Sequence, residues 1–277
     1  MILVSSMVLL YNRRHLEVLA SGMEGNGLSN MRRLVTSILL LLQAACSGER
    51  PALHDEAIPT SLPADGFTFP LDPGRYGPYV RGVTGPLDVD TRFGVQNPAL
   101  GDTPKCFQDR DGVKVPFREL YHAGEDWFRL DPAGQVELGA ARGEPVHAVA
   151  RGAVYMTQEI GSQGWIVVLA HQLADGASVY SAYWHVNQLQ VDQGDRVEKG
   201  QVIGVIHDQG RNSHLHWEIR AFADASQLFP PDSAGGRGTC NGRAAGVAYT
   251  WDDDPNRARP EYWGYFDPVT FIEDHQP

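Results

Sequence analysis

Apolar residues in the central part of the chain fall into short runs separated by glycines. Four of these runs, rich in β-branched and aromatic residues, cover 146–155, 164–170, 179–185 and 201–207. Runs of this length and composition between glycines predict β-strands. No long segment repeats apolar residues at the spacing of an amphipathic helix or a heptad. The pattern therefore predicts a mainly β fold, an antiparallel sheet with few short helices.

The flanks of this region lack such a pattern. Residues 46–112 are rich in Pro, Gly and Asp, which predicts a tether followed by irregular structure. Residues 221–277 return to Pro, Gly and aromatic residues, and Pro268 is placed to begin a short final helix. We expect a signal region at 1–45, the irregular N-terminal segment at 46–112, the core at 113–220, and an irregular C-terminal cap of the same domain at 221–277.

The N-terminus has the features of an export signal. A methionine and two arginines at 31–33 precede the apolar run 34–45, which has the length of a signal-peptide core and is too short to span a bilayer comfortably. Two alanines then precede Cys46, an arrangement that resembles a bacterial lipobox and makes Cys46 the predicted lipidation site. Cleavage after Ser47, which would release a soluble protein, is the alternative. Translation from Met31 is an alternative start.

Composition narrows the classes of partner. The 277 residues carry 23 Lys+Arg and 34 Asp+Glu, a net charge of −11, with no basic stripe. A nucleic-acid partner is therefore not expected, and a monomer is expected. Cys106 and Cys240 are the cysteines left after Cys46. An oxidising compartment would permit a disulfide between them.

Histidine and acidic residues gather in three short motifs. These are YHAGED (121–126) with His122 and Asp126, YWH (183–185) ending in His185, and HLHWEI (214–219) with His214 and His216. Residues two apart on a strand face the same way, about 6–7 Å apart, so His214 and His216 are predicted to lie together. Two imidazoles and a carboxylate are ligand types of a catalytic zinc site, which keeps one position open for water.

These motifs, in this order, resemble those of the lysostaphin-type (LytM-like) zinc metallopeptidases, the peptidoglycan endopeptidases of bacterial cell walls. The resemblance extends to PVHAVARGAV (145–154), GDRVEKGQVIG (194–204) and DPVTFI (267–272). It implies that His122, Asp126 and His216 bind zinc and that His185 and His214 are the catalytic acid/base residues. We also expect the catalytic domain to have a groove over one sheet.

The resemblance implies hydrolysis of peptide bonds in peptidoglycan cross-links. Zinc would activate a water molecule and polarise the scissile carbonyl, while a neutral histidine takes the proton. Which of His185 and His214 is the base stays open. Such an enzyme is expected to be exported to the bacterial cell envelope, anchored to the membrane if Cys46 is lipidated, or else periplasmic or secreted.

Three other functions are alternatives. A catalytically silent relative would bind and activate other cell-wall hydrolases, and loss of metal residues would be its signature. A zinc carboxypeptidase or amidase on the same polymer would use similar ligands. The 194–204 segment is also similar to hairpins of lipoyl and biotinyl carriers, but Lys199 has the wrong local setting there.

Several neighbours of these motifs are predicted to be structural. Glu125 lies beside Asp126 but is not expected to be a general base, because nothing in the motif requires it to point at the metal. Trp184 and Trp217 are expected to fill the core, since side chains alternate along a strand. His171, near the end of a strand, is expected to serve a turn or hydrogen bonding.

Overall fold

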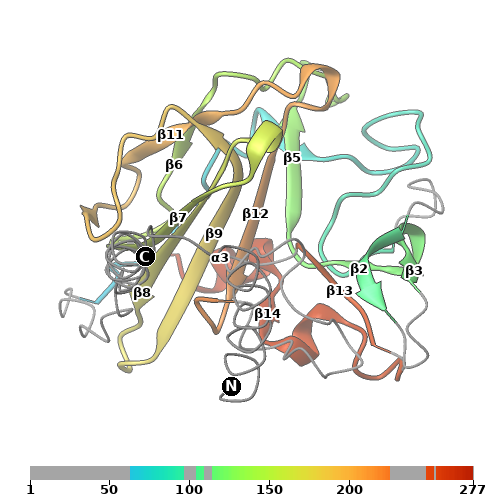
Figure 1. The fold of residues 1–277 in the computed structure, drawn as a ribbon. Helices are drawn as coiled ribbons and strands as arrows, with labels where there is room; N and C mark the ends of the chain where they lie inside the picture. Colours follow the sequence, from blue (N-terminus) through green and yellow to red (C-terminus); the bar gives the residue numbers. More distant parts are fainter. Residues whose placement is uncertain (1–62, 97–103, 109–113, 225–247, 253, 277) are drawn as a thin grey trace, which may run out of the picture. The chain divides into compact units, whose positions relative to one another are not determined.

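The computed structural model describes residues 63–96, 104–108, 114–224, 248–252 and 254–276 (Figure 1). They belong to one compact unit, Glu56–Pro277. Cys46, Cys240 and the side chain of Cys106 lie outside what the structure describes, so the lipid anchor and the disulfide stay predictions. Among the described residues, no helix combines the length and the apolar character needed to cross a membrane.

Ten strands of the described residues form one sheet, and their pairing is antiparallel throughout, as predicted. Its main path runs β1-β5-β12-β9-β8-β7-β10, while β11 pairs with β6 and β9, and β14 pairs with β12. Figure 1 shows β5, β12, β9, β8 and β7 side by side. The strands are β1 (Tyr76–Pro78), β5 (Glu125–Arg129), β6 (Pro145–His147), β7 (Gly152–Glu159), β8 (Trp165–Gln172), β9 (Ser178–Asn187), β10 (Arg196–Val197), β11 (Val202–Ile206), β12 (Leu215–Arg220) and β14 (Tyr265–Phe266).

Smaller elements flank this sheet. Two further pairs of strands are β4 (Tyr121–His122) with β13 (Tyr249–Thr250), and β2 (Pro104–Gln108) with β3 (Lys114–Pro116). The described 3-10 turns are η2 (Phe117–Glu119), η3 (Gly161–Gln163), η4 (Gly210–Asn212) and η7 (Pro260–Trp263). The predicted final helix is confirmed as α3 (Pro268–Asp274), where Asp267 Oδ1 accepts the Thr270 N–H at 3.0 Å.

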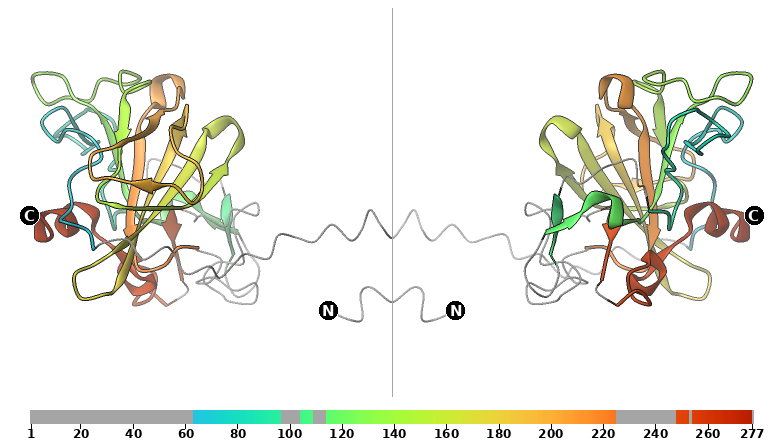
Figure 2. Two further views of the ribbon diagram at one scale, coloured as in Figure 1. Left: turned by 90° about the vertical axis from the view of Figure 1, so that its left-hand side faces the viewer. Right: turned by 90° about the vertical axis from the view of Figure 1, so that its right-hand side faces the viewer.

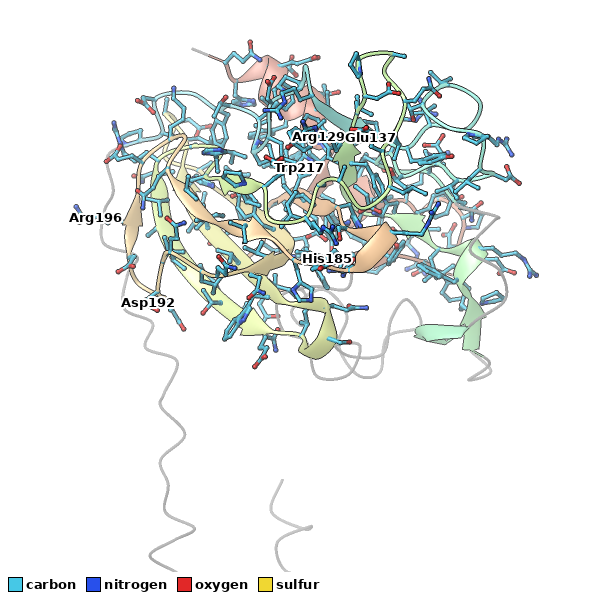
Figure 3. The ribbon with its side chains drawn as sticks, turned by 90° about the horizontal axis from the view of Figure 1, so that it is seen from above. Arg129, Glu137, His185, Asp192, Arg196 and Trp217 are labelled. Atoms are coloured by element: carbon cyan, nitrogen blue, oxygen red, sulfur yellow. The ribbon has the colours of Figure 1, made fainter. Side chains whose placement is uncertain are left out.

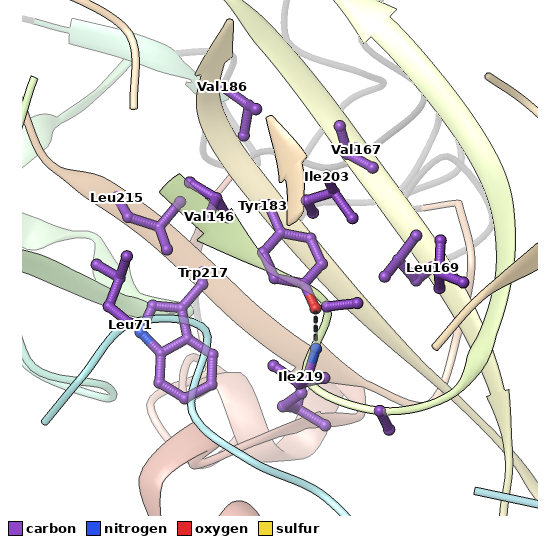
Figure 4. Packing of buried hydrophobic residues seen from close by; sticks show 14 of the residues in the cluster. Leu71, Val146, Val167, Leu169, Tyr183, Val186, Ile203, Leu215, Trp217 and Ile219 are labelled. Carbon is purple, nitrogen blue, oxygen red and sulfur yellow. Dashed lines mark hydrogen bonds between the residues drawn. The ribbon is translucent and has the colours of Figure 1, made fainter. Parts of the chain in front are cut away.

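The main core lies on one face of the central strands. Tyr183 of β9 and Trp217 of β12 are both 0% exposed and pack there with aliphatic residues (Figure 4). The Tyr183 hydroxyl accepts the Val149 N–H at 2.9 Å, so the buried phenol is not left without a partner. The prediction that Trp217 fills the core is confirmed.

The segment before the predicted core is more structured than its composition indicated. Phe67, Leu71 and Tyr76 belong to the main core, and β1 pairs with β5 at the sheet edge (Figure 2). Apolar residues alternate only over 67–71, a short run that contains Pro70 and lies among Pro, Gly and Asp, so the sequence shows no sustained strand or helix period. Tertiary contacts, rather than local pattern, order this segment.

Strand β9 contains a bulge at its end. Tyr183 and Val186 both pack in the main core, although a regular strand would place residues three apart on opposite faces. The pairing with β8 shifts register here, which leaves one extra residue on β9. His185 lies in this bulge with a left-handed φ of 61°. Its ring centroid is 4.8 Å from that of His214, on the face opposite the main core.

Candidate metal centre

The register of three adjacent strands aligns the central residues of the site. On β12, His216 pairs with Asp126 of β5 on one side and with Trp184 of β9 on the other. Directly paired residues project to the same face. Trp184 is 3% exposed, so its predicted burial is confirmed, but its ring lies 5.7 Å from the His216 ring rather than away from the histidine motifs.

The predicted zinc ligands His122, Asp126 and His216 form one cluster. Asp126 Oδ1 lies 2.7 Å from His216 Nδ1 and 3.2 Å from His122 Nε2. The two ring nitrogens are 2.9 Å apart. All three donor atoms lie within 4.8 Å of one another. Segments that are distant in sequence thus converge on a single point.

A glycine makes this convergence possible. A Cβ on Gly124, between His122 and Asp126, would lie 2.4 Å from the Trp217 carbonyl oxygen and 2.9 Å from His216 Cε1. Any side chain at this position would push the YHAGED segment away from β12. The glycine is therefore required for the close approach of β4 and β5 to His216.

The donor set fits a metal ion. His122 Nδ1 faces the Arg92 carbonyl oxygen at 3.3 Å, and His216 Nε2 faces Glu218 Oε1 at 3.0 Å. Both partners only accept hydrogen bonds, so the N–H of each ring points outward. In the neutral rings two nitrogen lone pairs and a carboxylate then face each other, and a cation would satisfy all three. Two imidazoles and one carboxylate match a zinc site with an open position.

His214 and His185 lie beside this cluster. His214 Nε2 is 3.6 Å from Asp126 Oδ1, and its Nδ1 is 2.6 Å from the Asn212 carbonyl oxygen. His185 Nδ1 is 3.1 Å from the Gln163 carbonyl oxygen. In the neutral His214 ring the Nδ1–H therefore donates to the backbone and Nε2 carries the lone pair, whereas His185 Nδ1 also has the Gln209 amide nitrogen at 2.8 Å. Figure 3 labels His185 at the end of β9.

Burial and charge set the protonation of the site. Burial lowers the pKa of His185 to about 3, helped by repulsion from His214, and burial also lowers the pKa of His214. Burial would raise the pKa of Asp126, but the three histidines His122, His214 and His216 hold it well below its usual value. Burial opposes the charge on His216, yet Asp126 and Glu218 raise its pKa to about 9 without a metal. A metal would therefore compete with a proton at His216.

Glu125 points away from the cluster, as expected. Its Oε1 accepts the Phe93 N–H at 2.9 Å and its Oε2 accepts the Trp127 Nε1–H at 3.2 Å. Burial raises the pKa of Glu125 to about 7. The described contacts give it a structural part in holding the 91–96 segment against β5.

Sequence reasoning missed three polar residues around the site. Glu218 contacts His216, and Arg220 contacts Glu218; both alternate with His216 along β12, which is a signal that could have found them. Gln209 is the third: its side-chain amide lies 2.8 Å from His185 Nδ1. No pattern in the sequence indicates this contact, because it depends on how η4 packs against β9.

The antiparallel β domain holds a centre of histidine and carboxylate side chains that could bind a metal ion. Residues 133–228 match Peptidase family M23, which confirms the predicted resemblance over this part of the chain. The match includes His185, His214 and His216 but begins after Asp126. The geometry, rather than the family match, brings in His122 and Asp126.

Individual relatives are also similar to parts of the chain. Peptidoglycan DD-endopeptidase ShyA of Vibrio cholerae is 31% identical over 93 residues, which are 33% of this chain and 21% of ShyA. The chain thus spans about a fifth of that relative. A zinc-containing peptidase structure from Vibrio cholerae covers 56% of this chain and 37% of its own, at 21% identity and TM-score 0.33. The lysostaphin catalytic domain of Staphylococcus simulans covers 62% and 89%, at 18% identity and TM-score 0.30.

Proposed function

We propose that the chain is a zinc-dependent endopeptidase that cleaves peptide bonds in peptidoglycan cross-links. The observation that carries this proposal is the convergence of His122, Asp126 and His216 with two further histidines beside them. The M23 domain supports a peptidase, and the similarity to a peptidoglycan endopeptidase supports the substrate.

In this proposal His122, Asp126 and His216 hold the zinc ion. When bound, zinc would supply Lewis acidity and lower the pKa of water to about 7. The ligand side chains are nearly enclosed, with His122 4% and His216 2% exposed, while the Asp126 side chain keeps 14% exposure. The chain thus keeps the ligands rigid and leaves one side of the cluster open.

His185 and His214 are the proposed proton carriers. Their lowered pKa values keep both rings neutral near pH 7, and the Asn212 carbonyl oxygen holds the Nδ1–H of His214. Each neutral ring then keeps one nitrogen lone pair that can take a proton from the attacking water. The same proton can pass to the departing amine when the peptide bond breaks.

We propose an extracytoplasmic location, since the substrate lies there. Lipidation of Cys46 would fix the enzyme at a membrane, and a periplasmic or secreted soluble form is the alternative. The proposal does not specify which peptide bond of the cross-link is cleaved.

The test is to purify the chain from residue 47, measure its zinc content, and incubate it with peptidoglycan with and without a chelator. About one zinc per chain and chelator-sensitive release of soluble fragments are expected. Zinc without fragment release would point to a blocked groove or another substrate, and a chain that binds no zinc would favour the catalytically silent relative. Fragment release that a chelator leaves unchanged, or a chain that binds no zinc, would contradict the proposal.

A further inference from the structure

Strand β12 carries a row of polar residues behind the proposed metal ligand. His216, Glu218 and Arg220 alternate along the strand and are 2%, 0% and 0% exposed. Charged residues with no solvent exposure are rare unless they are paired. This row therefore needs an explanation beyond filling the core.

The two oxygens of Glu218 have different partners. Oε1 accepts the Nε2–H of His216 at 3.0 Å, and Oε2 accepts an Nη1–H of Arg220 at 2.9 Å. A second arm of the guanidinium, Nη2, donates to the Ala223 carbonyl oxygen at 2.9 Å. The carboxylate is thus clamped between the ligand ring and an arginine that is itself anchored to the backbone.

Stability alone gives little reason for such a pair. Burying both charges carries a large desolvation cost, and well-packed apolar residues of similar size are often as stable or more so. The specific effect of Glu218 falls on His216. A carboxylate only accepts hydrogen bonds, so it fixes the proton on Nε2 and leaves the Nδ1 lone pair facing Asp126 and His122.

We propose that Glu218, clamped by Arg220, is a positioning residue that fixes the tautomer and ring orientation of His216 for metal binding. The inference rests on the proposed function, because it takes His216 as a zinc ligand. Removing such an outer partner of a ligand histidine typically weakens metal affinity by about 10- to 100-fold.

The chain supplies a matched control in Glu125. It is also buried, at 4% exposure, and it neighbours the ligand Asp126 in sequence. Its Oε1 accepts the Phe93 N–H and its Oε2 accepts the Trp127 Nε1–H, so both oxygens are used by groups other than a histidine. Both glutamates therefore hold buried hydrogen bonds, but Glu218 is the one that touches a proposed ligand.

The experiment compares Glu218→Gln and Glu125→Gln with the unchanged chain. Zinc affinity is measured by competition with a chromophoric chelator, and unfolding by urea is measured in excess chelator. Glutamine replaces one of the two carboxylate oxygens with an NH2 donor, so either His216 or Arg220 would face a donor in place of its acceptor. We expect zinc affinity to fall about 10- to 100-fold in Glu218→Gln and to stay within about twofold in Glu125→Gln.

Zinc affinity that is equal in Glu218→Gln and in the unchanged chain would overturn the inference alone. An unchanged chain that binds no zinc would overturn the proposed function, and this inference with it. If Glu218→Gln does not fold, nitrogen-15 NMR of the zinc-loaded unchanged chain decides. A His216 Nε2–H that is hydrogen-bonded and protected from exchange with water supports the inference, and a freely exchanging Nε2–H or a proton on Nδ1 overturns it.

Discussion

Two buried hydrogen-bond networks, each built around one histidine, lie in neighbouring strands and differ in the partners of the ring nitrogens. On β8 and β9, His171 Nδ1 donates to the Arg151 carbonyl oxygen at 2.9 Å, and its Nε2 lies 2.8 Å from Ser181 Oγ. Ser181 Oγ also lies 3.0 Å from the Tyr183 hydroxyl oxygen. On β12, His216 has Glu218 on one nitrogen and faces Asp126 and His122 with the other.

These hydrogen-bond partners distinguish a structural histidine, His171, from a proposed metal ligand, His216. His171 and His216 are both 2% exposed, so burial does not distinguish them. The His171 network is neutral and every ring nitrogen has a partner within the core, which confirms its expected hydrogen-bonding part. When the His216 ring is neutral, its network brings acceptors together without enough donors, and either a proton on His216 or a metal cation would correct that imbalance.

The largest effect should come from exchanging the two histidines for alanine in turn. His216→Ala removes a proposed ligand, so zinc binding and peptidoglycan cleavage should both be lost. His171→Ala should keep both while lowering the free energy of unfolding by about 1–3 kcal/mol, since buried partners are left unpaired. Metal analysis, fragment release and urea unfolding measure the contrast. Zinc retained by a folded His216→Ala would remove His216 from the ligand set.

A smaller and more selective effect is expected at His185. His185→Ala should keep zinc, because the ring is not in the ligand cluster, and should slow cleavage by about 10²–10⁴-fold, the usual contribution of an acid/base group. Zinc content and the cleavage rate, measured on the same sample, test this. Loss of zinc together with activity would mean that His185 acts on the metal site itself.

The smallest effect concerns the pH dependence of stability. Burial lowers the pKa of His171 from 6.5 to about 4, so in this pH range the unfolded chain binds a proton that the folded chain does not. The free energy of unfolding should therefore fall as pH falls from 6.5 toward 4, by about 1.4 kcal/mol per pH unit from this group. His171→Asn should show a shallower slope in urea unfolding with chelator present. Equal slopes in the two proteins would show that His171 is not the group responsible.

Local pattern was enough to predict much of the fold. Glycine-bounded apolar runs predicted the strands that became β7, β8, β9 and β11, and Pro268 predicted α3. These elements follow from propensity and turn chemistry, which act over a few residues. The segment before residue 97 was harder, because its apolar residues form no sustained period among Pro, Gly and Asp, and tertiary contacts order them.

The sequence by itself determined which chemistry the chain carries: three motifs that hold His122, Asp126, His185, His214 and His216, whose resemblance to a metallopeptidase family is confirmed. Tertiary structure alone decided how they meet. The strand register set Asp126 beside His216, the close approach at Gly124 admitted His122, and the β9 bulge turned His185 away from the main core. Side-chain alternation would have placed His185 on the wrong face, because a one-residue bulge leaves no sign in a period of two.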